Sequence, residues 1–305
     1  MTRILVTGVS GLLGLNFALA VDGKDHYVIG VANTASMRWA SFANIQAELT
    51  EPGRIEKLIT THKPDVILHC AAIAILETCE ANPELAEKVN ARLPSEIALA
   101  CRKHGIRMIQ ISTDAVFDGT RGNYSESDAP NPINIYARTK LEGERQVLEN
   151  NPDALVTRVN FYGWSAAGNR SLAENFVYKL EKGEKMLGFT DIQFSPMNVL
   201  DLADMLLEAE AKQLSGLYHL VGSEPMSKYQ FGVRIAQKFG FDPSLIQPVS
   251  VMEGDLQTPR SPNLTLCTEK ITKALGHELP PFDAGLQKFY DQYRRGYPQF
   301  IKTLV

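Results

Sequence analysis

The chain has 305 residues, of which 44% are hydrophobic and 22% charged, the proportions of a globular protein with one large domain or two closely joined ones. Its formal net charge of −4 gives no basis for a nucleic acid or a membrane as partner, and no apolar run approaches the ~20 residues of a membrane helix. Four cysteines without a C-x-x-C pair, and an N-terminus without a signal-peptide pattern, predict a cytoplasmic protein. The six histidines show no ligand spacing, so we expect no metal site.

The first segment has the order strand, glycine-rich turn, helix. Arg3–Thr7 is a short apolar strand, the turn Gly8-Val-Ser-Gly-Leu-Leu-Gly14 follows, and the helix continues over Leu15–Val21. Glycines permit a tight turn and the close approach of a pyrophosphate, which the free N–H groups of a helix N-terminus can bind. The alternative is a loop whose glycines serve turn geometry alone. The expected contacts with a dinucleotide here are Gly8, Ser10, Gly11, Leu12 and Leu13.

The second strand, His26–Val31, bears on the choice between NAD and NADP. An acid at its end would bind the adenine ribose of NAD, but Ala32, Asn33 and Thr34 follow instead. Arg38 could face the 2′-phosphate of NADP, although a solvated loop arginine is an open alternative. We therefore expect NADP(H), with NAD(H) still open. The contacts expected at this end of the cofactor are Asn33, Arg38 and, after a short third strand at Ile45–Glu48, Leu49.

The next segments continue the alternation of helix and strand. A helix is expected at Arg54–Thr61, and Asp65–Cys70 has the continuous apolar pattern of a buried parallel strand. The small residues Cys70, Ala71 and Ala72 at its end would let a cofactor pass close to the backbone. Pro83–His104 has helical periodicity, with Pro94 starting a second helical segment, and Ile106–Ser112 is the fifth strand.

The best candidate for chemistry follows a polar loop at Gly119–Pro132. A helix that ends near Asn150 carries Tyr136 and Lys140, which lie on one face because they are four residues apart. A nearby ammonium is expected to lower the pKa of the phenol, which would make Tyr136 usable in proton transfer. The alternative is an amphipathic helix without a catalytic role, in which Tyr136 packs in the interior and Lys140 is solvated. Either Ser112 or Thr113 could add a hydroxyl, since neighbours on a strand point to opposite faces.

The sequence predicts an α/β fold with a doubly wound parallel sheet and a smaller C-terminal lobe. A sixth strand at Ala154–Arg158 completes the alternation. We expect a dinucleotide-binding domain over 1–160 and a mainly substrate-binding lobe over 161–305, with residues of about 196–222 returning to the first domain. The elements expected in the second part are one strand, Leu217–Val221, and helices near Leu172–Glu181, Val199–Ala211, Lys228–Phe239, Glu269–Leu275 and Ala284–Tyr293.

Three strings of residues resemble the dTDP-4-dehydrorhamnose reductase family of the extended short-chain dehydrogenase/reductase superfamily. The first two are Ser112-Thr-Asp-Ala-Val-Phe-Asp-Gly119 and Pro132-Ile-Asn-Ile-Tyr-Ala-Arg-Thr-Lys-Leu-Glu-Gly-Glu144. The third, Arg260-Ser-Pro-Asn263 before Leu266, is looser because Ser261 stands where that family usually has proline. The resemblance runs from Arg3 to about Gly276.

The resemblance implies reduction of a 4-keto group on a nucleotide-linked deoxysugar. Thr113 would hydrogen-bond the carbonyl oxygen, Tyr136 would protonate the alkoxide, and Lys140 would hold the nicotinamide ribose. A homodimer stays open. Bacterial members of this family often carry a glutamate, tied to a magnesium site between subunits, where this chain has Asn16, which weakens the case for a magnesium-dependent dimer. The residues expected to bind the substrate are Asp114, Asn175 and Arg260, with a turn-capping role for Asp114 and a surface role for Arg260 as open alternatives.

Two other functions stay open. His69-Cys-Ala-Ala72 and Met226-Ser-Lys-Tyr229 resemble the regulatory β subunits of methionine adenosyltransferase, which bind NADP and act through a partner enzyme. A nucleotide-sugar epimerase or dehydratase is the third reading. It ranks last because a dehydratase commonly needs an acid pair after the catalytic hydroxyl, and only Asp114 is acidic there, before Ala115.

Overall fold

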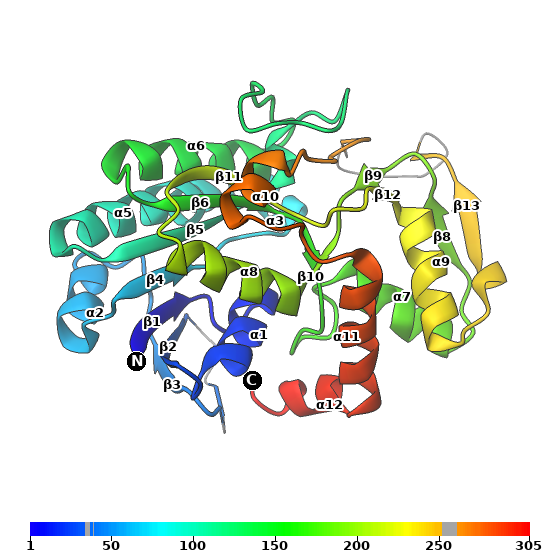
Figure 1. Ribbon diagram of the computed structural model, residues 1–305, viewed down its shortest axis with the longest axis horizontal. Coiled ribbons are helices and arrows are strands. Elements are labelled where there is room, and N and C mark those ends of the chain that lie inside the picture. The colour runs from blue at the N-terminus through cyan, green and yellow to red at the C-terminus, as the bar shows by residue number, and fades with distance from the viewer. Residues whose placement is uncertain (34–36, 39, 252–260) are drawn as a thin grey trace.

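The computed structural model describes all residues except 34–36, 39 and 252–260. Its centre is a seven-stranded sheet in the order β11-β6-β5-β4-β1-β2-β3, with every neighbouring pair parallel (Figure 1). This confirms the predicted doubly wound fold. The strands are β1 (Thr2–Thr7), β2 (His26–Ala32), β3 (Ala43–Gln46), β4 (Val66–His69), β5 (Arg107–Thr113), β6 (Leu155–Val159) and β11 (Gly216–Leu220).

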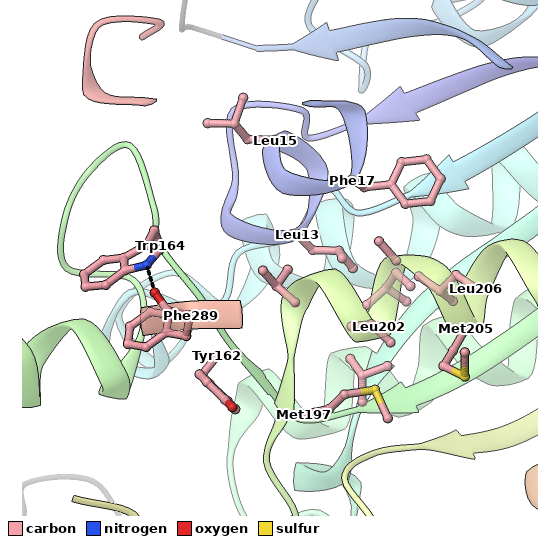
Figure 2. Close-up of a cluster of buried hydrophobic side chains, with 14 of the residues drawn as sticks. Leu13, Leu15, Phe17, Tyr162, Trp164, Met197, Leu202, Met205, Leu206 and Phe289 are labelled. Atoms are coloured by element: carbon pink, nitrogen blue, oxygen red, sulfur yellow. Dashed lines mark hydrogen bonds between the residues drawn. The ribbon is translucent and has the colours of Figure 1, made fainter. Parts of the chain in front are cut away.

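Helices cover both faces of the sheet because the central strands carry apolar side chains on each of their two faces. On one face, α1 (Leu12–Val21) packs beside α8 (Val199–Ala211), and Figure 2 shows Leu13 and Phe17 of α1 in one cluster with Leu202 of α8. The other face buries residues of three helices in a second cluster. These helices are α2 (Arg54–His62), α5 (Leu93–His104) and α6 (Ile135–Asn150).

The second part of the chain contributes to the sheet and also builds a small lobe. Strand β11 pairs with β6, and α8 lies against α1, so both belong to the sheet layers. The lobe contains two short strand pairs, β8 with β13 and β9 with β12, beside α7 and α9 (Figure 1). The elements are β7 (Phe161–Tyr162), α7 (Leu172–Glu181), β8 (Met186–Phe189), β9 (Gln193–Phe194), β10 (Met197–Asn198), β12 (Met226–Ser227), α9 (Lys228–Phe239), η3 (Pro243–Leu245), β13 (Ile246–Val249), α10 (Glu269–Leu275), α11 (Phe282–Arg294) and α12 (Tyr297–Lys302).

The long helical segment before β5 differs from its expected form. The helix α3 (Leu76–Ala81), which the sequence pattern did not predict, precedes α4 (Pro83–Glu87), a π-helical segment η1 (Lys88–Arg92) and α5. The wide η1 turn brings the carbonyl of Asn90 so close to α6 that a Cβ at Gly143 would lie 2.3 Å from it. Gly143 is therefore required for the contact between η1 and α6. No described helix is long and apolar enough to cross a membrane.

Asn16 ties α1 to two distant segments. Its side chain is fully buried, and Nδ2 donates to the carbonyls of Leu12 and Trp164, both at 2.8 Å. Its Oδ1 accepts the hydroxyl of Tyr297 at 2.9 Å. Trp164 in turn stacks on Phe289 with 4.1 Å between ring centroids and donates to the Phe289 carbonyl (Figure 2). Asn16 therefore has a structural role in this chain, because it joins α1 to α12.

We expect Asn16→Ala to lower the free energy of unfolding by about 2–4 kcal/mol, because it leaves the Trp164 carbonyl and the Tyr297 hydroxyl buried without partners. Tyr297→Phe removes only one of these bonds and should cost about 1 kcal/mol. Urea unfolding of both variants measures the two changes. Equal costs for the two variants would contradict a bridging role for the asparagine.

Candidate active site

The turn after β1 lies in close contact with the segment after β4. Gly8 has a φ of +66°, and a Cβ there would lie 2.7 Å from Cα and N of Ala71. Ala71 also donates its N–H to Thr7 Oγ1 at 3.3 Å. Cys70 has a buried thiol whose pKa burial raises to about 12, so it stays protonated, and Ala72 is exposed. The small residues of both segments leave the backbone open to a ligand that lies across them.

The N-terminus of α1 fits an anion. Its N-cap residue, Gly11, is exposed and provides no side-chain cap, and the first turn contains no acidic residue. The first N–H groups of the helix and its positive dipole end are therefore available to a pyrophosphate. Ser10 and Leu12 are partly exposed here. Leu13 is buried in the cluster with α8, so only its backbone could contact a cofactor.

The end of β2 has an acid beside it that the sequence analysis missed. Asn33 Nδ2 donates to Glu48 Oε2 at 2.8 Å. Hydrogen bonds from Thr50, chiefly from its backbone N–H, hold the pKa of Glu48 below its usual value. The sheet topology could have indicated Glu48, because β2 and β3 are parallel neighbours whose ends meet at one edge of the sheet.

The two other residues expected at this end differ in exposure. The Arg38 side chain is exposed, and its N–H donates to the Leu304 carbonyl at 2.7 Å. Leu49 has its side chain in the apolar cluster under the sheet, so only its backbone could contact a cofactor.

Thr113, Tyr136 and Lys140 meet where β5 ends and α6 begins. Asn134 caps α6 by accepting the N–H of Ala137 at 2.9 Å, which starts the helix immediately before Tyr136. The Tyr136 phenol lies near the Thr113 hydroxyl. Lys140, one turn further on, is buried and donates its ammonium to the Ile111 carbonyl at 2.6 Å. The strand end and the helix face are thus next to each other.

The pKa of the phenol shifts in the opposite direction from the one expected. Burial raises the pKa of Tyr136 to about 12, outweighing the hydrogen bond from Thr113. Burial also lowers the pKa of Lys140 to about 8. The expected lowering by the ammonium was wrong, because burial of the phenol outweighs the effects that would lower its pKa. Tyr136 therefore keeps its proton at neutral pH, as a proton donor must.

The two neighbouring hydroxyls have different partners. Ser112 Oγ donates to Glu144 Oε1 at 2.5 Å in a buried environment. Thr113 lies on the Tyr136 side, where its hydroxyl also accepts the N–H of Ala115 at 3.1 Å. The structure thus gives Thr113, rather than Ser112, access to the phenol.

Asp114 adds a buried carboxyl next to these groups. Asn160 donates to its Oδ2 at 2.6 Å, and the Thr113 hydroxyl lies 3.2 Å from Oδ1. Burial raises the pKa of Asp114 to about 6, since the bonds from Asn160 and Thr113 offset the desolvation only in part. A carboxylate has about four acceptor positions, so Asp114 keeps capacity for a ligand hydroxyl.

A cavity of about 260 Å³ opens beside Tyr136. Asn160, Gln193 and Lys228 line it, and the sequence analysis had singled out none of these three as site residues. Asn175 is exposed on α7 and does not line this cavity, and Arg260 lies outside the described residues. No group of three or more His, Cys, Asp or Glu side chains in the described part of the chain could hold a metal ion. The other lining residues are Leu76, Ala115, Asn134, Ile192, Phe194, Ser261 and Leu264.

Comparison with known proteins places these features in a family. The model of the RmlD substrate binding domain matches residues 1–295. A probable low-salt glycan biosynthesis reductase, Agl14 of Haloferax volcanii, is 31% identical over 94% of this chain and 98% of its own. Methionine adenosyltransferase 2 subunit beta of Xenopus tropicalis is 32% identical over 94% of this chain and 86% of its own. The crystal structure of a dTDP-4-dehydrorhamnose reductase from Clostridium acetobutylicum has a TM-score of 0.84 at 26% identity and covers 96% of this chain and 100% of its own.

We expect Thr113→Val to lower kcat more than Ser112→Ala, because only the Thr113 hydroxyl reaches Tyr136. The loss for Thr113→Val should be about 10–100-fold, the effect of one hydrogen bond at a reacting oxygen. Steady-state kinetics of both variants, with cofactor affinity as the control for folding, measures this difference. A larger loss of kcat in Ser112→Ala would show that Ser112, and not Thr113, supplies the hydroxyl.

Proposed function

The chain belongs to the RmlD substrate binding domain family, and from this premise we propose that it is an NADP(H)-dependent reductase of a 4-keto group on a nucleotide-linked deoxysugar. The observation that most supports this activity is the position of Tyr136 on the cavity wall, near the Thr113 hydroxyl and with the buried Lys140 one turn along α6. Together they give a ketone oxygen a neutral donor, a second hydroxyl and a nearby cation.

Each of these side chains has a distinct role in the proposed reaction. NADPH, when bound, supplies the hydride. Thr113 donates its hydroxyl to the carbonyl oxygen, where negative charge develops. Tyr136 gives its proton to the same oxygen, and its raised pKa keeps that proton available at neutral pH. Lys140 binds the nicotinamide ribose and stabilises the phenolate that Tyr136 becomes.

The uncapped start of α1 would hold the cofactor pyrophosphate, with Gly8, Ser10 and Gly11 at closest approach. Asn33 and the exposed Arg38 would face the adenosine end, where a guanidinium suits a 2′-phosphate. We therefore propose NADP(H), with NAD(H) as the weaker alternative.

Further proposals concern the residues that bind the substrate. Asp114 would accept hydroxyls of the sugar, and Arg260 the substrate diphosphate. Asn175 stays a candidate substrate contact, although it lies outside the described cavity.

The protein would work in the cytoplasm, which agrees with its four free cysteines. It would form a homodimer.

The reductase proposal is tested by oxidation of NADPH with a small panel of nucleotide-linked 4-keto sugars. Reduction of at least one member, lost in Tyr136→Phe, supports the proposal. Tight binding of NADPH without reduction of any member of a broad panel contradicts it.

A second function is a regulatory subunit that acts on a synthetase. The observation in its favour is the 32% identity to methionine adenosyltransferase 2 subunit beta over most of both chains. Capture of a synthetase in a pull-down, with its activity changed by this chain and unaffected by Tyr136→Phe, would favour that role. A dehydratase is less well supported, because Ala115 lines the cavity where the second acid of the pair would stand.

Tyr136→Phe should lower kcat by about 10²–10⁴, the usual effect of a positioned general acid. NADPH affinity should stay near that of the unmodified protein, since the ring and the glycine-rich turn are unchanged. Lys140→Met should lower kcat and also weaken NADPH binding through the lost ribose contact. Fluorescence titration with NADPH distinguishes the two variants. Unchanged cofactor affinity in Lys140→Met would argue against the ribose contact.

The Michaelis constant for the sugar should rise as pH falls from 7 to 5. The pKa of Asp114, raised to about 6, makes its carboxyl increasingly protonated in this range, and a protonated carboxyl is a weaker acceptor for a sugar hydroxyl. Loss of a hydrogen bond to a charged group corresponds to roughly a tenfold rise or more. Asp114→Asn should have a raised and pH-independent constant over the same range. A flat profile in the unmodified enzyme would show that Asp114 does not bind the sugar.

A further inference from the structure

A buried ion pair lies directly behind the proposed catalytic residues. Arg158 of β6 donates Nη2 to Glu144 Oε2 at 2.7 Å and Nε to Glu144 Oε1 at 3.0 Å, and both side chains are at most 4% exposed. Ser112, the neighbour of Thr113, completes the pair through its bond to Glu144. Two buried charges are costly unless they are fully hydrogen-bonded, and apolar residues often replace such pairs without loss of stability. A role in positioning would account for this pair.

His219 of β11 extends the network away from Glu144. Its Nδ1 lies 3.3 Å from the Cys267 carbonyl, which can only accept, so Nδ1 carries the proton. Its Nε2 therefore accepts from Arg158 Nη1 at 3.4 Å. Burial and then the charge of Arg158 lower the pKa of His219 to about 3, so the ring is neutral at physiological pH. An unbroken chain of donors and acceptors runs from Ser112 to Cys267.

The far end of this chain belongs to the wall segment, which we define as residues 261–267. Leu264 of the wall segment donates its N–H to the Gln193 carbonyl at 2.9 Å, and Cys267 donates to the Tyr124 carbonyl at 2.7 Å. Ser261 and Leu264 line the cavity beside Tyr136. The same buried network therefore contacts β5 next to Thr113 and, at Cys267, the segment whose Ser261 and Leu264 line the cavity.

We propose that Arg158 and His219 are positioning residues, which hold the wall segment at a set distance from the end of β5 and so shape the substrate cavity. Neither residue touches the cavity itself. The proposal rests on the proposed function where it concerns substrate binding. The placement of the wall segment, by contrast, can be measured without any turnover.

His219→Phe is the direct test. It keeps an aromatic ring for the edge contact with Phe117, whose centroid lies 6.0 Å away, but removes both hydrogen bonds. His219→Gln is the conservative variant, because its amide can donate to the Cys267 carbonyl and accept from Arg158. Thr157→Val is the matched control, a buried polar side chain beside Arg158 on β6 that lies outside the network.

The expected result of His219→Phe is faster hydrogen exchange at the N–H groups of Leu264 and Cys267, by about tenfold, and a Michaelis constant for the sugar raised about five- to twentyfold. Its kcat should stay within about twofold, and its NADPH affinity should be unchanged. His219→Gln should restore both quantities, and Thr157→Val should match the unmodified protein. If His219→Phe does not fold, His219→Leu removes the same two bonds with a smaller side chain.

Exchange rates and a Michaelis constant that stay unchanged in His219→Phe would overturn the proposal. Equal effects of Phe and Gln at this position would overturn it as well, since the hydrogen bonds would then be irrelevant. If the protein reduces no 4-keto sugar, the proposed function fails while the exchange measurement still decides whether the network holds the wall segment.

Discussion

The docking of one face of α6 on the end of β5 is the contact on which the candidate site depends. Tyr136, Lys140 and Glu144 follow one another at four-residue intervals and so share a helix face. Lys140 donates to the Ile111 carbonyl, Glu144 accepts from the Ser112 hydroxyl, and Tyr136 lies near Thr113, so the helix face meets three successive residues of β5. Because Lys140 and Glu144 are charged and buried, the helix cannot shift along the strand without leaving a charge unsatisfied.

This docking also determines the protonation states that the chemistry needs. The same burial acts in opposite directions on the pKa values of Tyr136 and Lys140. It raises the pKa of the Tyr136 phenol and lowers that of the Lys140 ammonium. The phenol is thereby kept as a donor, while the nearby Glu144 partly offsets the effect of burial on the pKa of the lysine, whose ammonium donates to the Ile111 carbonyl. A change that exposes this helix face to water would alter both groups at once.

The substrate cavity depends on contacts between segments that are distant in the sequence. Gln193 and Lys228 come from the lobe, Asn160 from the end of β6, and Ser261 and Leu264 from the wall segment. One side of the cavity thus lies at the sheet edge, and the rest is built by segments that are held through their own hydrogen bonds.

The sequence by itself determined the local structure and pointed to Tyr136 and Lys140 as candidate reacting groups. The helix Lys228–Phe239 was predicted at its observed bounds, and in the structure a Ser227 capping box begins it and Gly240 ends it. The juxtaposition of Tyr136 and Lys140 followed from helical spacing alone. Only the tertiary structure decided which hydroxyl faces the phenol, which way the pKa of Tyr136 shifts, that Glu48 lies beside Asn33, and which lobe residues line the cavity. The physical reason is that spacing along the chain specifies hydrogen bonds within a few residues, whereas burial and the meeting of strand ends depend on residues far away in the sequence.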